Sequence, residues 1–363
     1  NYFFYLPDGD MDALNFEARA WNWSKDGFLN TFNYYKGPDA YFISFFYSIP
    51  YSLFGRSILM LQSISILFGL GSVFLGWLLA KKLWGNQTAK KVGWTIALFP
   101  SIVSYSVLTM REVYISFFLL VAIFGIVNWT RNQNLKSLFL VIFGFVGATL
   151  FHGASIIGLF IFFLFIFFDS LEKIYLLIKS KRINLKIIVF LILSSVILLS
   201  YLSNKISISY LGSFNQSMNV SKVQEIINKR MKGYAIYPEW LKVNNSYELF
   251  YKAPIRFVYF LYSPFPWDIK KPIHMVGLLD SFLYMTLSYL IFRNRKIIWK
   301  DPALRMILII LIFYFFVFGV GVSNFGTGIR HRSKFVVGLI LLAAPLIPKI
   351  KFFNKKKLKE FIK

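Results

Sequence analysis

Long apolar segments constrain this chain more than any other feature of its sequence. Several of them approach or exceed the roughly 18 residues that a helix needs to cross the hydrocarbon core of a bilayer. Hydrophobic residues make up 57% of the 363 residues and aromatic residues make up 20%. A soluble protein of this size needs more polar surface than such a composition provides. The sequence therefore predicts an all-α, polytopic transmembrane helical bundle.

About nine spans are expected in the chain. The run 137–168 would be about 48 Å long as one helix at about 1.5 Å per residue, too long for a single crossing of a core about 30 Å thick. We therefore divide it at "FHGAS" into two short spans. The expected spans are 57–80, 92–108, 113–130, the two parts of 137–168, 187–202, 274–292, 306–322 and 334–348.

Two further apolar segments are too short to cross a membrane. Residues 40–54 contain Pro50, and residues 254–265 run into the sequence "SPFPW". We expect both to be helices that lie in the membrane interface on the outer face. The whole chain, 1–363, is predicted to form a single domain, in which 1–56 is a first outer loop with its interfacial helix and 204–273 is a larger outer loop.

The distribution of charged residues indicates which ends of the predicted spans face the cytoplasm. If residue 1 lies outside, the segments on the inside hold 23 of the 41 Lys and Arg residues but only four of the 16 acidic residues. This is the bias of the positive-inside rule, and a single span at 137–168 would instead put the basic C-terminal tail outside. The net charge of +25 is thus mainly a topology signal, with cytoplasmic loops facing anionic lipid, and not a sign of nucleic acid binding. An outside start also implies one earlier span before residue 1.

Carboxylates gather on the outer side of this map. Asp8, Asp10 and Asp12 lie within "LPDGDMDAL", and Glu112 follows Arg111 in a very short outer turn between two spans. A carboxylate at the boundary of lipid and water can take the proton from a hydroxyl group as that group attacks a substrate. These acids are the candidate catalytic residues.

Basic residues also lie on that side, where topology statistics disfavour them. The segment "SNFGTGIRHRSK", 323–334, carries Arg330, His331 and Arg332. The guanidinium of Arg is a planar fork that suits phosphate. Together with Arg111, these three residues are candidates for binding a phosphate, and Asp8, His152 and Arg256 are candidates for further substrate contacts.

Sugar transfer from a polyprenyl phosphate suits such a set of residues. The donor lipid lies in the bilayer with its phosphate at the interface. The departing phosphate needs positive charge where its own charge develops, and it needs no general acid.

The first third of the chain also resembles a known family. The acidic "PDGDMDALNFEARAW", the interfacial "YFISFFYSIPYSLFGRS", a span that ends in "AKKLWG" and the segment "GWTIALFPSIVSYSVLTMRE" follow one another. This order resembles the GT-C superfamily of membrane glycosyltransferases, such as the protein O-mannosyltransferases and the aminoarabinose transferases of lipid A, over roughly residues 5–130. The resemblance implies that Asp10 or Asp12 is the catalytic base and that Glu112 is the acid of the second outer loop. No motif of that family matches "GTGIRHR", whose role rests on charge and position alone.

The resemblance implies a bacterial cytoplasmic (inner) membrane protein whose active site faces the periplasm or the exterior. The expected partners are a polyprenyl-linked sugar donor, membrane lipids, and a glycan, lipid or protein acceptor. No cofactor is required by the sequence, although a divalent ion between the acids and the phosphate is compatible with Asp-x-Asp.

Other readings of these residues stay open. The chain could be a polysaccharide polymerase of the Wzy kind, which uses a polyprenyl-diphosphate donor, or a transporter or flippase of a lipid-linked glycan. Asp10 and Glu112 could be helix-starting residues, and the basic segment could bind lipid headgroups only. Asp280, inside a span, is expected to be paired in the bundle interior.

Overall fold

The computed structural model describes residues 12–180, 224–225, 227–228, 231, 235–245, 247–272 and 274–348 of the chain. Every named element in these residues is a helix, and the only β-type pairing among them is one isolated bridge between Ile236 and Asn324. The predicted all-α class is confirmed.

Four helices are long and apolar enough to cross a membrane, which makes this a membrane protein by helix length and composition. They correspond to four of the expected spans. They are α4 (Ile58–Trp84), α7 (Glu112–Asn132), α14 (His274–Arg293) and α16 (Pro302–Gly321).

Other expected spans are shorter or interrupted. The segment 92–108 forms α5 (Asn86–Leu98) and α6 (Pro100–Ser106), because Pro100 has no backbone N–H and starts a new helix at its first position. The segment 334–348 forms α18 (Val336–Ala343) and the short η5 (Ala344–Leu346). The expected span 187–202 lies outside the described residues. The total of nine spans is therefore not confirmed.

The predicted interruption at "FHGAS" is present. Helix α8 (Leu135–Phe151) ends there, a single turn η2 (Gly153–Ser155) follows, and α9 (Ile156–Ser180) begins. His152 at the junction has an extended backbone, with φ −157° and ψ 107°, so the helix cannot continue through it.

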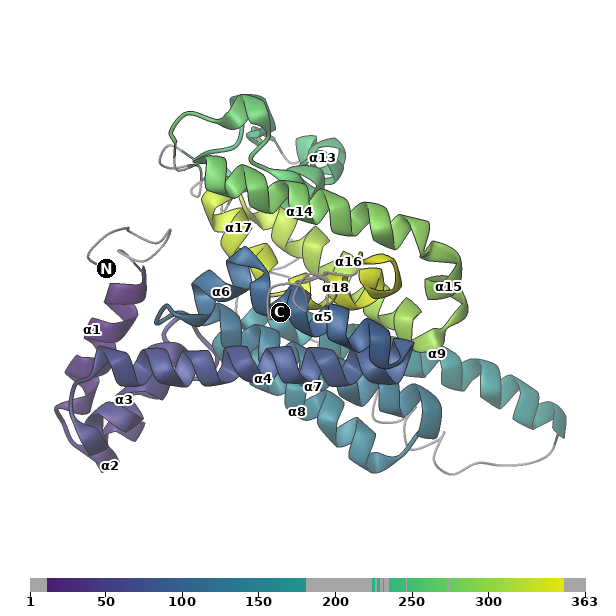
Figure 1. Ribbon diagram of the computed structural model, residues 1–363, viewed down its shortest axis with the longest axis horizontal. Helices are drawn as coiled ribbons and strands as arrows, with labels where there is room; N and C mark the ends of the chain where they lie inside the picture. The colour runs from purple at the N-terminus through teal and green to yellow at the C-terminus, as the bar shows by residue number, and fades with distance from the viewer. Residues whose placement is uncertain are drawn as a thin grey trace, which may run out of the picture.

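Glycines bring α7 and α8 into backbone contact. A Cβ added at Gly144 would lie 2.4 Å from the Ala122 nitrogen, and one at Gly125 would lie 2.6 Å from the Val141 nitrogen. Small residues of this kind let membrane helices approach closely. The two helices therefore form a tight antiparallel pair, with α8 along the lower edge of the bundle in Figure 1.

The N-terminal helices form a separate group beside the start of α4, at the left of Figure 1. The group contains α1 (Asp12–Ser24), α2 (Phe28–Thr31), η1 (Phe32–Tyr34) and α3 (Phe42–Phe54). The buried Glu17 of α1 accepts hydrogen bonds from Tyr51 at 2.8 Å and from Arg56 at 2.9 Å through both carboxylate oxygens. The Arg56 guanidinium holds the pKa of Glu17 below its usual value, so this ion pair stabilises the packing of α1 on α3 at neutral pH.

Hydroxyl groups connect this N-terminal group to the bundle. Tyr47 of α3, Ser65 of α4 and Tyr114 of α7 are buried and mutually hydrogen-bonded at 2.9 to 3.0 Å. Buried hydroxyls that satisfy one another fix three helices in one arrangement.

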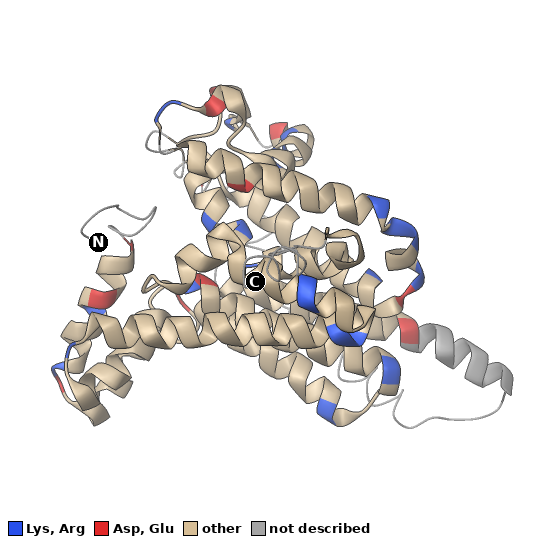
Figure 2. Cartoon of the chain, in the orientation of Figure 1, with Lys and Arg blue, Asp and Glu red and all other residues tan. Residues whose placement is uncertain are grey.

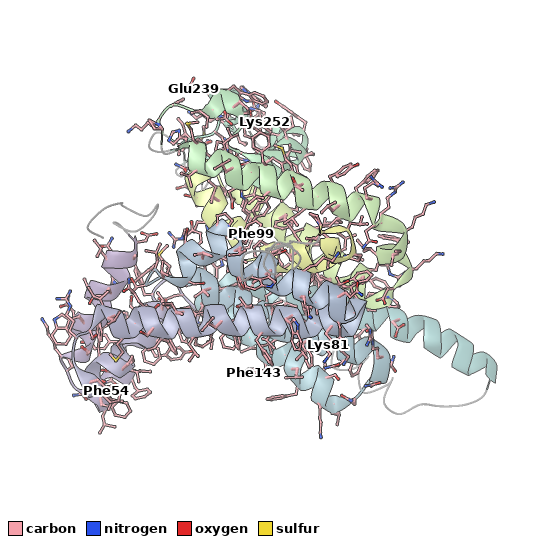
Figure 3. All side chains as sticks on the ribbon, in the orientation of Figure 1. Phe54, Lys81, Phe99, Phe143, Glu239 and Lys252 are labelled. Carbon is pink, nitrogen blue, oxygen red and sulfur yellow. The ribbon has the colours of Figure 1, made fainter. Side chains whose placement is uncertain are left out.

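Five further named helices complete the described part of the bundle. They are η3 (Glu239–Leu241), α13 (Glu248–Tyr262), η4 (Pro266–Asp268), α15 (Arg295–Lys300) and α17 (Phe325–Ser333). The expected interfacial segment 254–265 is thus the second half of α13 and the turn after it. Large apolar side chains remain exposed around the bundle, including Phe54 of α3 and Phe143 of α8, which lie at its edge in Figure 3.

The bundle has two chemically different ends, and Figure 2 shows Lys and Arg concentrated at one of them. At this end, which we call the basic end, the last turns of α4, α7 and α14 carry basic residues, and Arg131 donates a hydrogen bond to the Lys82 carbonyl at 3.2 Å. The opposite end, where α7 and α17 begin, is called the site end. At the basic end, the basic residues in the last turns of α4, α7 and α14 are Lys81, Lys82, Arg131 and Arg293.

Candidate functional site

Five charged side chains from separate parts of the chain meet at the site end. We call them the ionic cluster: Asp12, Arg111, Glu112, Arg330 and Lys334. Asp12 is the first residue of α1, Glu112 is the first residue of α7 with Arg111 just before it, Arg330 lies in α17, and Lys334 follows that helix.

Two buried hydrogen bonds hold these elements together. The Thr109 hydroxyl donates to the Ala13 carbonyl at 2.9 Å, which fixes the start of α1 against the turn before α7. The Ser116 hydroxyl donates to the Lys334 carbonyl at 3.1 Å, which fixes α7 against the junction of α17 and α18. These hydrogen bonds, from side-chain hydroxyls to backbone carbonyls, position the segments that carry the charged side chains without involving the charges.

Glu112 is the centre of the cluster and is 1% exposed. Its Oε1 accepts a hydrogen bond from Arg330 Nε at 2.9 Å and lies 3.7 Å from Lys334 Nζ. A buried carboxylate without such partners would be strongly destabilising. The second oxygen, Oε2, is buried and has no hydrogen-bond partner among the described residues.

Arg330 joins the buried acid to a more exposed one. Its Nε binds Glu112, and its Nη1 is hydrogen-bonded to Asp12, whose side chain is 50% exposed. Burial alone would lower the pKa of Arg330, but the two carboxylates raise it above its usual value, so the guanidinium stays charged. Its third nitrogen, Nη2, is buried without a partner in the described part of the chain.

Arg111 adds further unused donors. Its side chain is buried, and its guanidinium carbon lies 5.9 Å from the centre of the Phe16 ring. Neither Nε nor Nη1 has a hydrogen-bond partner among the described residues. Buried guanidinium nitrogens are almost always hydrogen-bonded in proteins, so those of Arg111 and Arg330 mark a place suited to an anionic group.

His331 lies behind this cluster. Its Nδ1 is 2.6 Å from Lys334 Nζ, and its ring lies edge-on to that of His152, with 5.4 Å between the centroids. Burial, and then the charge of Lys334, lowers the pKa of His331 well below its usual value. Burial also lowers the pKa of Lys334. A neutral His331 therefore accepts a hydrogen bond from Lys334 and does not itself supply positive charge to an anion.

Arg332 has quite different surroundings, although it is only two residues from Arg330. Two residues along a helix correspond to a rotation of about 200°, so the side chains leave opposite faces of α17. Arg332 is completely buried and binds Asp280 of α14 at 2.8 Å, and its Nη1 donates to the Leu261 and Ser263 carbonyls at 2.8 Å. The prediction that Asp280 is paired in the interior is confirmed.

Arg256 of α13 is also occupied by the fold. It is fully buried and donates to the carbonyls of Leu241 at 2.9 Å and Val322 at 2.6 Å, and to the Ser323 hydroxyl at 2.9 Å. The structure thus places Arg256 and Arg332 outside the ionic cluster, with their donors directed at protein groups.

The other sequence candidates divide into two groups. His152 is buried behind His331, and its ring packs against the rings of His331 and Phe318. Asp8 and Asp10 lie outside the described residues. Lys334 belongs to the site, although no separate role was predicted for it from the sequence. Its position in the outer basic segment is the same signal that marked Arg330.

No group of three or more His, Cys, Asp or Glu side chains able to hold a metal ion is present in the described parts of the chain. No protein-family model, curated protein or solved structure matches this chain.

Proposed function

We propose that the chain is a membrane glycosyltransferase that transfers a sugar from a polyprenyl-phosphate-linked donor to an acceptor at the outer face of the membrane. Its products would be cell-surface polysaccharides or glycoconjugates. One observation carries the proposal: buried guanidinium N–H groups of Arg111 and Arg330 lack protein partners in the described residues, beside two carboxylates at the end of a membrane helix.

The charges of the cluster suit a phosphodiester. Arg111, Arg330 and Lys334 supply three positive charges when all are ionised, against two negative charges on Asp12 and Glu112. A bound phosphodiester beside Lys334 would favour the protonated form of this lysine, and the excess of one positive charge would then match the single negative charge of a polyprenyl-phosphate sugar. As the bond between the anomeric carbon and the phosphate oxygen breaks, the leaving phosphate gains a second negative charge, and fixed positive groups stabilise that charge most strongly in the transition state.

The two carboxylates have different environments and are given different roles. Asp12 is half exposed and can be reached by an acceptor, so it accepts the proton of the acceptor hydroxyl while the hydroxyl oxygen bonds to the anomeric carbon. Glu112 is buried against Arg330 and Lys334 and acts as a positioning residue for Arg330. Asp10, suggested by the GT-C resemblance, and the neighbouring Asp8 are alternative bases.

The proposed location follows from the two ends of the bundle. The basic end would face the cytoplasm, as the positive-inside rule requires, and the site end would face the periplasm or the exterior of a bacterial cytoplasmic membrane. A lipid-linked donor has its phosphate at that interface. Transporters more often place ionised groups near the membrane midplane, whereas the ionic cluster lies at helix ends.

The test is sugar transfer in liposomes. The purified protein is supplied with polyprenyl-phosphate-linked hexoses and an acceptor extract from bacterial envelopes, and release of polyprenyl phosphate is measured. Asp12→Asn should reduce turnover by about two to four orders of magnitude, the usual contribution of a general base. The matched control is Glu239→Gln, an exposed acid remote from the cluster, which should retain activity (Figure 3). Full activity in Asp12→Asn would show that this residue is not the base, and absence of release by the wild type would contradict the proposal.

A further inference from the structure

A hollow lies in the N-terminal group of helices, lined by none of the residues of the ionic cluster. It has a volume of about 210 Å³. Aromatic rings and charged side chains share its wall. We call it the aromatic cup, and it is defined by Arg19, Trp23, Tyr34, Tyr35, Asp39 and Tyr41.

The rings of the cup are held in fixed positions. Trp23 and Tyr34 are stacked, with 5.0 Å between their centroids and 11° between their planes. The Tyr34 hydroxyl is hydrogen-bonded to the carboxylate of Asp26, which holds its ring in place. The Arg19 guanidinium lies 3.9 Å above the centre of the Tyr41 ring. Such prearranged rings can receive a ligand with little loss of side-chain entropy.

The cup also has accessible surface and a polar rim. Tyr35 and Tyr41 are 47% and 42% exposed. Lys36 and Asp39 belong to the lining, and Asp39 accepts a hydrogen bond from the Tyr41 backbone at 2.7 Å. This distinguishes the cup from the purely apolar exposed surface nearby, formed by Phe28, Leu29 and Phe54, which suits lipid chains.

Aromatic faces bordered by charged groups suit a carbohydrate. The C–H groups of a sugar ring form an apolar face that packs against an aromatic ring, and the hydroxyls around its edge bind charged or polar side chains. The cup provides both features: rings for the faces, and Arg19, Lys36 and Asp39 for the hydroxyls. A lipid chain would leave those charged groups unsatisfied.

One face of α1 connects the cup to the ionic cluster. Asp12, Phe16, Arg19 and Trp23 follow the helical spacing i, i+4, i+7 and i+11, which places them on one side of the helix. Phe16 lies between the two sites, because its ring is 5.9 Å from the Arg111 guanidinium carbon and 6.5 Å from the Tyr41 ring. Asp12 and Arg19 are separated by about 10 Å along the helix axis. A ligand that reaches both must be longer than one hexose.

We infer that the aromatic cup is a glycan-binding subsite, and that it holds an oligosaccharide acceptor whose reactive end lies at Asp12. The acceptor role rests on the proposed function, whereas binding of a glycan to the cup does not.

A glycan array tests the binding directly. The full chain, purified in detergent, is applied to immobilised neutral and acidic oligosaccharides of one to six sugars. Wild-type protein should bind oligosaccharides of two or more sugars. Tyr35→Ala and Arg19→Met should weaken binding about tenfold or more, since each removes a direct contact. Tyr247→Ala, at a more exposed tyrosine outside the cup (82% against 47% for Tyr35), is the control and should bind normally.

The arms of the experiment separate the alternatives. Arg330→Gln should lose transfer activity and keep glycan binding, so a failure of the proposed function is distinguished from a failure of the cup. Absence of binding by the wild type, or undiminished binding by both cup variants, would overturn the inference. Cup-dependent binding of dihexanoylphosphatidylglycerol with no glycan binding would assign the cup to lipid headgroups and would also overturn it.

Discussion

Two buried groups of arginines in this protein differ in how completely their hydrogen bonds are satisfied. Arg332 and Arg256, which we call the anchor region, direct their guanidinium groups at carbonyls, hydroxyls and Asp280. Arg330 and Arg111, in the ionic cluster, are also buried, although slightly less completely, and retain nitrogens without partners in the described residues. Burial and charge are common to both regions. Hydrogen-bond completeness is the property that separates a structural role from a binding role.

The anchor region should show the largest effect on stability. Arg332→Leu leaves Asp280 and the Leu261 and Ser263 carbonyls without their partner, and removal of one member of a buried ion pair costs about 3–5 kcal/mol. Thermal unfolding in detergent measures this loss. The double variant Arg332→Leu with Asp280→Leu should recover part of it, because no uncompensated charge remains. If Arg332→Leu were as stable as the wild type, the anchor region would not have the structural role that distinguishes it from the ionic cluster.

The ionic cluster should show its effect on activity. Arg330→Lys keeps the charge, but a single ammonium cannot bind Glu112 and Asp12 while also presenting a further N–H to phosphate. We expect transfer to fall by about 10²- to 10³-fold, the usual cost of one donor to a developing anion. The unfolding temperature should change little. Arg293→Lys, exposed at the basic end, is the control, and equal activity in both variants would contradict a phosphate-binding role for Arg330.

A pH dependence should give the smallest effect. The pKa of His331 is lowered by burial and by Lys334, Arg330, His152 and Arg111, so below about pH 6.5 the unfolded chain binds a proton that the folded protein does not. Stability therefore falls as the pH decreases from 7.5 to 5.5.

His331→Gln tests this assignment, because it lacks the titrating group. Unfolding temperatures of both proteins over that pH range are compared. A smaller fall in the variant is expected. Identical pH profiles would show that His331 does not titrate between the folded and unfolded states.

The sequence predicts the bundle better than it predicts the site. The length of the apolar segments alone identifies α4, α7, α14 and α16. A helix in the bilayer core satisfies its own backbone hydrogen bonds, so each span can be one continuous apolar segment of the sequence. The junction at His152 is also recognisable, since its flanking runs are together too long for one crossing. Pro100 divides 92–108 for an equally local reason, although the sequence prediction treated that segment as a single span.

The sequence does not distinguish the surroundings of the candidate site residues where these depend on tertiary neighbours. "RHR" reads as one basic group, and nothing in those three letters shows that Arg332 meets Asp280 from α14 while Arg330 meets Glu112 from α7. Lys334 lies in the two-residue turn between α17 and α18, and its place in the cluster depends on how that turn packs against α7. The pairing of α1 with α7 through Thr109 likewise joins segments 96 residues apart.

We propose that the ionic cluster holds the phosphate of a polyprenyl lipid, so the protein should bind this lipid in the absence of turnover. Native mass spectrometry of the purified protein measures the binding of a polyprenyl phosphate and of the matching polyprenol, which lacks only the phosphate. We predict that the phosphate form binds at least about tenfold more tightly, and that Arg330→Lys or Arg111→Lys removes most of this preference while Arg293→Lys keeps it. Equal binding of the two lipids by the wild-type protein would contradict the account.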